Sequence, residues 1–197
     1  NYTFPSKTWP QNHSKRLKLT AMNSYNKLAF LEKKQVKRKG EGLKMTKWIE
    51  CVPNFSEGRR KEVVDEIVSA ILEVPGVRLL DMEMDPDHNR SVVTFVSPIE
   101  RAVEAAFRGI KKAQELIDLN KHEGEHPRIG ATDVVPFVPL PGTSMEDCIK
   151  LAEKLGKRVW EELRIPVYLY GEAARIPERQ DLAYIRKGEF EGLRAVS

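Results

Sequence analysis

The chain has 197 residues, of which 41% are hydrophobic and 31% are charged, and its formal net charge is +4. This length predicts one domain, or one domain with an appendage, and the composition is ordinary for a globular protein. No run of 18 apolar residues occurs, which argues against a transmembrane helix, and the two cysteines, Cys51 and Cys148, are too few for a disulfide framework or a cysteine zinc site. Two reduced thiols are typical of a cytoplasmic protein, so we expect that location.

Positive charge is concentrated near the N-terminus. Residues 1–44 hold 11 of the 33 Lys and Arg residues but only two acidic residues, Glu32 and Glu41, so the rest of the chain is mildly acidic. A lysine-rich stretch with few apolar side chains cannot form a core, and we expect a disordered or non-native leader over 1–44 and one domain over 45–197. The alternative for the leader is a tail that binds nucleic acid or a membrane surface. For the domain we expect neither partner, because its charge balance is acidic.

From residue 48 the sequence alternates predicted strands and helices. Apolar and β-branched runs predict strands at 48–52, 77–84, 91–96, 134–140 and 167–170. The two prolines in 134–140 suit an edge strand or a strand end.

The helices are predicted from apolar residues at helical spacing. Two of them cover 59–74 and 100–119, and the capping-box sequence at 143–146 starts a third. The third helix is expected to bury Cys148, Leu151, Leu155 and Val159. The order β-α-β-β-α-β, followed by an extra α-β, predicts an α/β (α+β) domain of the ferredoxin-like, split β-α-β type. Each helix has one apolar stripe, so we expect a single sheet with the helices on one face.

Polar residues that could perform chemistry gather in the irregular segment 120–133. It contains two of the four histidines, His122 and His126. They are flanked by Lys121, Glu123, Glu125, Arg128 and Asp133. Two glycines and a proline predict a loop, and loops commonly carry functional sites. The alternative from these residues alone is a solvated, charged loop.

The segment 122–126 also fits the His-Glu-x-x-His pattern of zinc peptidases. That chemistry requires a helix that directs both histidines to one metal ion. Gly124 lies in the middle of the required turn, and Pro127 disfavours helical geometry at His126. We therefore predict no zinc site and no other metal.

Several motifs resemble a known family in order and nearly without gaps over residues 48–193. They are CVPNFSEG at 51–58, NR at 89–90, KHEGEHPRIGATD at 121–133, PVYLYGEAA at 166–174 and GEFEG at 188–192. Together they closely resemble the N-terminal subdomain of the glutamate formimidoyltransferase (formiminotransferase) family. Residues 1–44 have no counterpart in the family.

The resemblance implies a transferase of one-carbon groups that moves a formimino group from N-formiminoglutamate to N5 of tetrahydrofolate in histidine degradation. Tetrahydrofolate is then a co-substrate, and no metal is required. The family's catalytic histidine lies in its Gly-Glu-His-Pro motif, which corresponds to His126. Transfer between two amines requires one proton to leave N5 and one to reach the departing nitrogen, and an imidazole can do both in turn.

Other polar residues are candidates for binding substrate or folate. Arg90 and Arg128 can pair with substrate carboxylates, and Asp81 or Glu83 can stabilise a cationic adduct and orient the imidazole. The family usually has Asp at the position of Glu83. Asn54 is a further candidate, with strand termination as its alternative role. Asp81 and Arg90 have local roles as alternatives, namely solvation of a strand end and pairing within the turn 85–89.

The remaining polar and aromatic residues are expected to be structural. His88 belongs to a polar turn, and His122 shapes the loop. Tyr168 and Tyr170 are expected to pack rather than stack on folate.

The family's full transferase unit has two similar subdomains with folate in the cleft between them, and the second is absent from this sequence. We therefore expect an enzyme unit completed by a second formiminotransferase subdomain or by a homo-oligomer. The alternative is a catalytically incomplete relative that binds folate or assembles without turnover.

Overall fold

The computed structural model describes residues 46–195. The predictions for the leader 1–44 lie outside the described residues. Within the described range, none of the helices combines the length and apolar character needed to cross a membrane.

A curled antiparallel sheet forms the centre of the domain. Its strands are β1 (Trp48–Cys51), β2 (Asn54–Phe55), β3 (Arg78–Asp85), β4 (Arg90–Pro98), β5 (Thr132–Val134) and β6 (Phe137–Pro139). β4 is central, with β3 on one side and β1 and β2 on the other. On the outer side, β6 pairs with β1 and β5 pairs with β2.

Two of the strand paths are interrupted, each at a Val-Pro pair. Pro53 separates β1 from β2 and Pro136 separates β5 from β6. A proline has no N–H to donate, so the ladder breaks locally. The carbonyl of Pro53 nevertheless accepts from Val93 at 3.0 Å, and that of Pro136 accepts from Val52 at 3.1 Å. Counted as continuous paths, the strands lie in the order fourth, first, third, second, which confirms the ferredoxin-like prediction.

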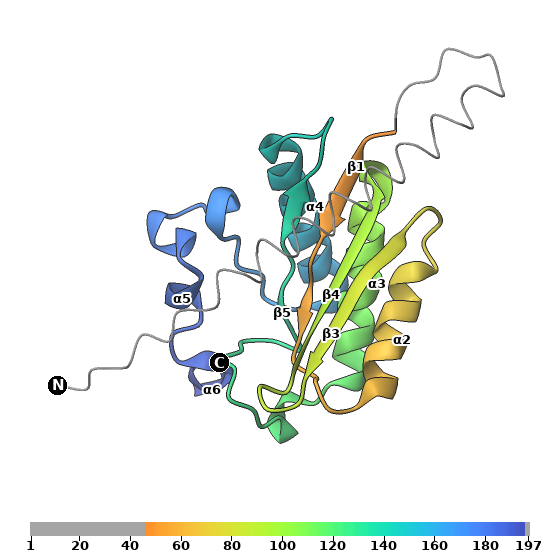
Figure 1. Ribbon diagram of the computed structural model, residues 1–197. Helices are drawn as coiled ribbons and strands as arrows, with labels where there is room; N and C mark the ends of the chain where they lie inside the picture. The colour runs from red at the N-terminus through yellow and green to blue at the C-terminus, as the bar shows by residue number, and fades with distance from the viewer. Residues whose placement is uncertain (1–45, 196–197) are drawn as a thin grey trace, which may run out of the picture. The chain divides into compact units, whose positions relative to one another are not determined.

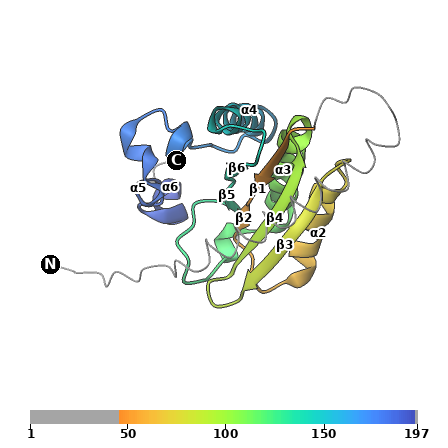
Figure 2. The ribbon, with the colours of Figure 1, turned by 45° about the horizontal axis from the view of Figure 1, so that its top comes forward.

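Three long helices share one core with the sheet. They are α2 (Lys61–Leu72), α3 (Ile99–Leu116) and α4 (Met145–Leu163). Figures 1 and 2 show α2 and α3 side by side behind the sheet, and α4 contacts both α3 and β6. Their apolar stripes meet strand side chains such as Ile49, Val93 and Phe95 in a single cluster. The prediction that the helices pack on one face is therefore confirmed.

The opposite face of the sheet is polar near the β3–β4 turn. Met82 and Met84 pack against the core, so the alternating residues Asp81, Glu83 and Asp85 lie on the other face. Asp85 is the cross-strand partner of Arg90, which places that arginine on the same face. The helix-free face thus carries ionisable groups at the end of the sheet where β3 turns into β4.

Two local predictions are wrong. Residues 167–170 form no strand. The neighbouring edge, β5 and β6, contains Pro136 and Pro139, which lack the N–H groups that a further strand would need. The N-cap of α4 is Ser144 rather than Thr143, and its capping box is completed by Asp147. The Thr143 hydroxyl is engaged elsewhere, donating to the Leu140 carbonyl at 2.7 Å.

After α4 the chain is irregular and ends in short helices. Three-residue or four-residue turns at Gly171–Ala173 and Pro177–Gln180 lead to α5 (Leu182–Ile185) and α6 (Glu189–Ala195). In Figure 2 these helices, drawn in blue, lie apart from α2 and α3.

Removing one methyl group from the core should have a modest, measurable cost. Ile67 of α2 is 0% exposed, so Ile67→Val is expected to lower the free energy of unfolding by about 0.5–1.5 kcal/mol. Ile176, which is 41% exposed, offers the same substitution as a control, and Ile176→Val is expected to change it by less than about 0.5 kcal/mol. Urea unfolding of both variants measures the difference. Equal effects would mean that the core is not where the structure places it.

Candidate functional site

The loop 122–133 is fastened to the β3–β4 turn through Asn89. Asn89 has a left-handed backbone with φ of 47°, and its side-chain oxygen accepts from the Gly58 N–H at 2.9 Å. Its side-chain amide donates to the Glu123 carbonyl at 2.9 Å. A Cβ on Gly58 would lie 2.2 Å from the Asp85 carbonyl oxygen, and one on Gly124 would lie 2.4 Å from that of His88. The glycines of two separate motifs therefore press against the same turn.

His126 lies at the centre of a charged cluster. Its side chain is only 12% exposed. Nε2 lies 3.7 Å from Asp133 Oδ2, while Arg90 Nη1 lies 3.4 Å from Nε2 and 3.5 Å from Nδ1. The ring of His88 meets it edge-on, with 6.5 Å between the ring centres. The imidazole is thus placed between a carboxylate and a guanidinium.

Asp133 is the carboxylate that the structure places against the imidazole, rather than Asp81 or Glu83. Its side chain is 1% exposed. Oδ1 accepts from the Ile129 N–H at 3.0 Å, and Oδ2 is paired with Arg186. Burial raises the pKa of Asp133, but the nearby His126 imidazole, the paired Arg186 guanidinium and the hydrogen bond from the Ile129 N–H outweigh it, and the pKa is lowered.

This lowered pKa predicts a pH-dependent contribution to stability. A carboxyl whose pKa is lower in the folded chain stabilises it above the unfolded value of 3.8, and the contribution is lost as the pH falls through the folded value. Asp133→Asn is expected to cost about 1–3 kcal/mol near neutral pH, because Arg186 loses its charged partner. Urea unfolding across pH should show that the difference in free energy of unfolding between the wild type and Asp133→Asn shrinks below pH 3.8. A gap that does not change with pH would contradict this account.

Arg90 reaches this cluster from the first residue of β4. Burial, together with the positive charge of Arg186, lowers the pKa of Arg90, while the nearby carboxylates of Asp133, Asp85 and Glu83 raise it. An arginine remains charged under such shifts because its ordinary pKa is so high. Asp85 in turn binds His88 Nδ1 at 2.8 Å.

His122 occupies a different place from His126. Its Nε2 lies 2.9 Å from the Asn89 carbonyl, and its Nδ1 accepts from Arg128 Nε at 3.0 Å. Since a carbonyl only accepts and a guanidinium only donates, both ring nitrogens are committed with the proton on Nε2. This geometry fits a histidine that shapes the loop.

Arg128 is directed toward the C-terminal helix α6. Its Nη1 donates to Glu189 at 2.9 Å, its Nη2 donates to Glu191 at 2.8 Å, and its side chain is nearly buried. The other donors go to His122. In this arrangement the guanidinium binds groups of the chain itself, and its predicted contact with a substrate carboxylate stays a prediction.

The remaining predicted site residues lie outside the His126 cluster. The buried side chain of Asn54 donates to the Val52 carbonyl at 2.9 Å, and Asp81 accepts from the Met82 N–H at 2.9 Å. Glu83 is exposed on β3, within electrostatic range of Arg90. Their roles in binding stay predictions.

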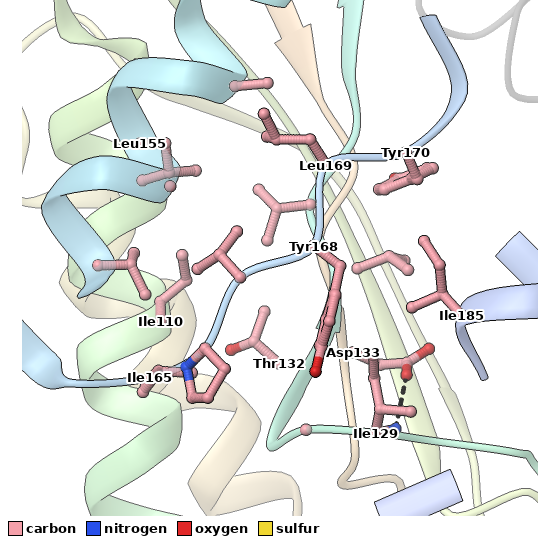
Figure 3. Close-up of a pocket in the computed structure, with 18 of the residues that line it drawn as sticks. Ile110, Ile129, Thr132, Asp133, Leu155, Ile165, Tyr168, Leu169, Tyr170 and Ile185 are labelled. Atoms are coloured by element: carbon pink, nitrogen blue, oxygen red, sulfur yellow. Dashed lines mark hydrogen bonds between the residues drawn. The ribbon is translucent and has the colours of Figure 1, made fainter. Parts of the chain in front are cut away.

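An apolar cavity of about 790 Å³ lies behind the site, between α3, α4, β5 and the segment after α4. Figure 3 shows the ring of Tyr168 between Thr132 and Asp133 in that view, with Ile110, Leu155 and Ile165 on the side of the long helices. Tyr168 also carries Arg179 over its ring at 5.0 Å. Burial raises the pKa of Tyr170 well above its ordinary value. Asp133 belongs both to the cavity wall and to the His126 cluster.

The helix that the zinc-peptidase pattern requires is not formed. Residues 122–126 have no helical structure, and His122 is engaged with Asn89 and Arg128. Among residues 46–195, no group of three or more His, Cys, Asp or Glu side chains is arranged to hold a metal ion.

The resemblance in the loop and turn motifs is matched by the family comparison. The family model described as "Formiminotransferase domain, N-terminal subdomain" matches residues 48–197. The chain belongs to this family. The matched range contains β1 to α6 and every residue of the His126 cluster.

Curated relatives agree with this assignment. The chain is 62% identical over 143 residues to a glutamate formimidoyltransferase of Thermoplasma acidophilum, covering 73% of this chain and 47% of that protein. It is 54% identical over 149 residues to a formimidoyltransferase-cyclodeaminase of Mus musculus, and the match covers 76% of this chain and 28% of that protein. It is 49% identical over 149 residues to a glutamate formimidoyltransferase of Streptococcus pyogenes, covering 76% and 50%. The chain therefore spans half or less of the length of these relatives.

Sequence reasoning missed two members of the cluster. Asp133 was noted only as a flanking residue of the loop, and Arg186 lies 53 residues further along the chain. The signal for Asp133 was available, because it closes the motif that contains His126. Arg186 had no such signal, since only the folded chain brings α5 to the loop.

Proposed function

We propose that this chain is the catalytic-histidine half of an enzyme that transfers a formimino group from N-formiminoglutamate to tetrahydrofolate. The observation that carries the proposal is the position of His126, held between Asp133 and Arg90 on the loop that bears the family's Gly-Glu-His-Pro motif. Two relatives over 45% identical bear the printed name glutamate formimidoyltransferase.

The reaction forms one C–N bond and breaks another. N5 of tetrahydrofolate attacks the formimino carbon, and a tetrahedral adduct forms. His126 takes the proton that N5 loses and delivers it to the glutamate nitrogen, which leaves with the electrons of the old C–N bond. The nearby Asp133 carboxylate stabilises the imidazolium formed between these two steps. Protons and charge balance without a metal or a covalent intermediate with the protein.

The charges around His126 also suit the adduct. The former formimino carbon bears nitrogens that favour positive charge, and the carboxylates of Asp85 and Glu83 lie on the same sheet face as Arg90. Oriented carboxylates lower the energy of a cationic adduct. Arg90 in turn offers a guanidinium to a substrate carboxylate.

We propose that a second formiminotransferase subdomain, or a second copy of the chain, completes the folate site. In support, the chain spans only 47% and 50% of the two relatives named glutamate formimidoyltransferase. A place in histidine degradation and in the cytoplasm belongs to the same proposal, and the two buried free cysteines are compatible with a reducing compartment.

The test is a formimino-transfer assay with N-formiminoglutamate and tetrahydrofolate. It is run on this chain alone and on the chain supplied with the second subdomain of a full-length relative. Transfer by the supplemented protein supports the proposal. Binding of tetrahydrofolate without transfer in either case would favour the alternative, a relative that binds folate without turnover.

A further inference from the structure

Two arginines link the C-terminal segment of α5 and α6 to the loop of His126 through three ion pairs. Arg186, which follows α5, pairs with Asp133 of the loop side, and Arg128 of the loop pairs with Glu189 and Glu191 of α6. The Phe190 N–H also donates to the Arg128 carbonyl at 2.9 Å. One arginine belongs to the C-terminal segment and the other to the loop, so each segment supplies both an arginine and a carboxylate.

The Arg186 pair is the one that reaches the reacting group. Asp133 Oδ2, the oxygen that binds Arg186, is also the oxygen 3.7 Å from His126 Nε2. Asp133 Oδ1 is occupied by the Ile129 N–H. Both oxygens of the Asp133 carboxylate are therefore held in place. The position of this carboxylate sets which ring nitrogen of His126 faces a negative charge.

The burial of Arg186 shows that this contact has a cost. Its side chain is 17% exposed, and its Nε is buried without a hydrogen-bond partner among the described residues. A buried donor without a partner costs about 1–3 kcal/mol. A surface arginine would avoid that cost, so the arrangement calls for a compensating role.

We propose that Arg186 is a positioning residue for His126 and acts through Asp133. Resting on the proposed function of His126, this assigns the α5–α6 segment a part in catalysis. Arg186 holds Asp133 charged and in place, and Asp133 holds the His126 proton on Nε2. An imidazole with its proton on Nε2 has its free lone pair on Nδ1, so Nδ1 is then the nitrogen that accepts the substrate proton. Arg90 Nη1 lies 3.4 Å from Nε2 and 3.5 Å from Nδ1, so it does not select between them, and the choice rests on Asp133.

The first test reads the ring tautomer of His126 in this chain by long-range proton–nitrogen spectroscopy, at about pH 8, where histidines are ordinarily neutral. The wild-type ring is expected to carry its proton on Nε2, and Arg186→Met and Asp133→Asn are expected to convert it to a mixture. Arg186→Lys should retain more of the Nε2–H form. His122, whose proton is fixed by other partners, is an internal reference for intact folding.

Arg175→Met is the matched control, because Arg175 is an exposed arginine of the same region that pairs with Glu153. It should leave the tautomer unchanged. An unchanged His126 tautomer in Arg186→Met would overturn the proposal. If that variant fails to fold, Arg186→Gln replaces it with the same criterion.

The second test measures kcat of formimino transfer in the supplemented protein. Arg186→Met is expected to lower kcat about 10–100-fold, the range for outer groups that orient a functional histidine. Combined with Asp133→Asn, it should add no further loss, since both act on one path. Additive losses would overturn the proposal. If the wild type shows no transfer but the tautomer results are as expected, the proposed function is contradicted. The inference that Arg186 positions His126 through Asp133 would then still hold.

Discussion

His126→Ala is expected to lower kcat of formimino transfer by about 10²–10⁴ in the protein supplied with its second subdomain, the usual contribution of a positioned acid–base group. The imidazole lies beside both Asp133 and Arg90, and histidine is the side chain that most often serves as a general acid–base group. Tetrahydrofolate affinity should change little, because the residue acts on the transition state rather than on ground-state binding. Steady-state kinetics and equilibrium binding of tetrahydrofolate measure the two quantities separately.

His122→Ala is the comparison that decides between the two histidines. Its ring links the Asn89 carbonyl to Arg128, so its loss should loosen the loop and lower kcat less than His126→Ala does. Near-normal kcat in His126→Ala, together with abolished kcat in His122→Ala, would mean that the wrong histidine was chosen. Full activity of both variants would place the catalytic site outside this loop.

The ferredoxin-like order was accessible from the sequence because each element has a clear period. The helices carry one apolar stripe each, and the run of β-branched residues at the centre of β4 is typical of a strand. The extra strand at 167–170 failed because strand formation depends on a partner. Residues 167–170 line a cavity instead of pairing with the neighbouring edge, which contains two prolines.

The site was predictable only where its residues share a motif. His126 stands in a short, specific sequence, and Arg90 follows the turn that the same family resemblance marks. The carboxylate that orients the imidazole was expected at Asp81 or Glu83. Asp133 takes that place instead, since the β5 bulge beside β2 and the charge of Arg186 bring it there. Such a three-body arrangement depends on tertiary packing, which spacing along the chain does not encode.

Gly58→Ala is expected to destabilise the domain by about 3 kcal/mol, the upper part of the range for overpacked sites. The added Cβ would lie 2.2 Å from the Asp85 carbonyl oxygen, and 2.4 Å and 2.7 Å from the Arg90 nitrogen and carbonyl oxygen. These are backbone atoms at the two ends of the β3–β4 turn, so a side-chain rotation cannot relieve the clash. The turn must move, and the Gly58 N–H must part from Asn89 Oδ1, which leaves a buried donor without its partner.

Gly192→Ala is the matched control for this substitution. Gly192 lies in α6, and a Cβ there would meet no atom within 4 Å, so the change should be neutral or slightly stabilising because alanine favours helix. Urea unfolding of the two variants gives the comparison. Equal stability of Gly58→Ala and the wild type would show that the turn does not pack against Gly58.

The displacement of the turn in Gly58→Ala also moves Asn89, which holds the His126 loop through Glu123, so a folded Gly58→Ala protein should lose transfer activity as well.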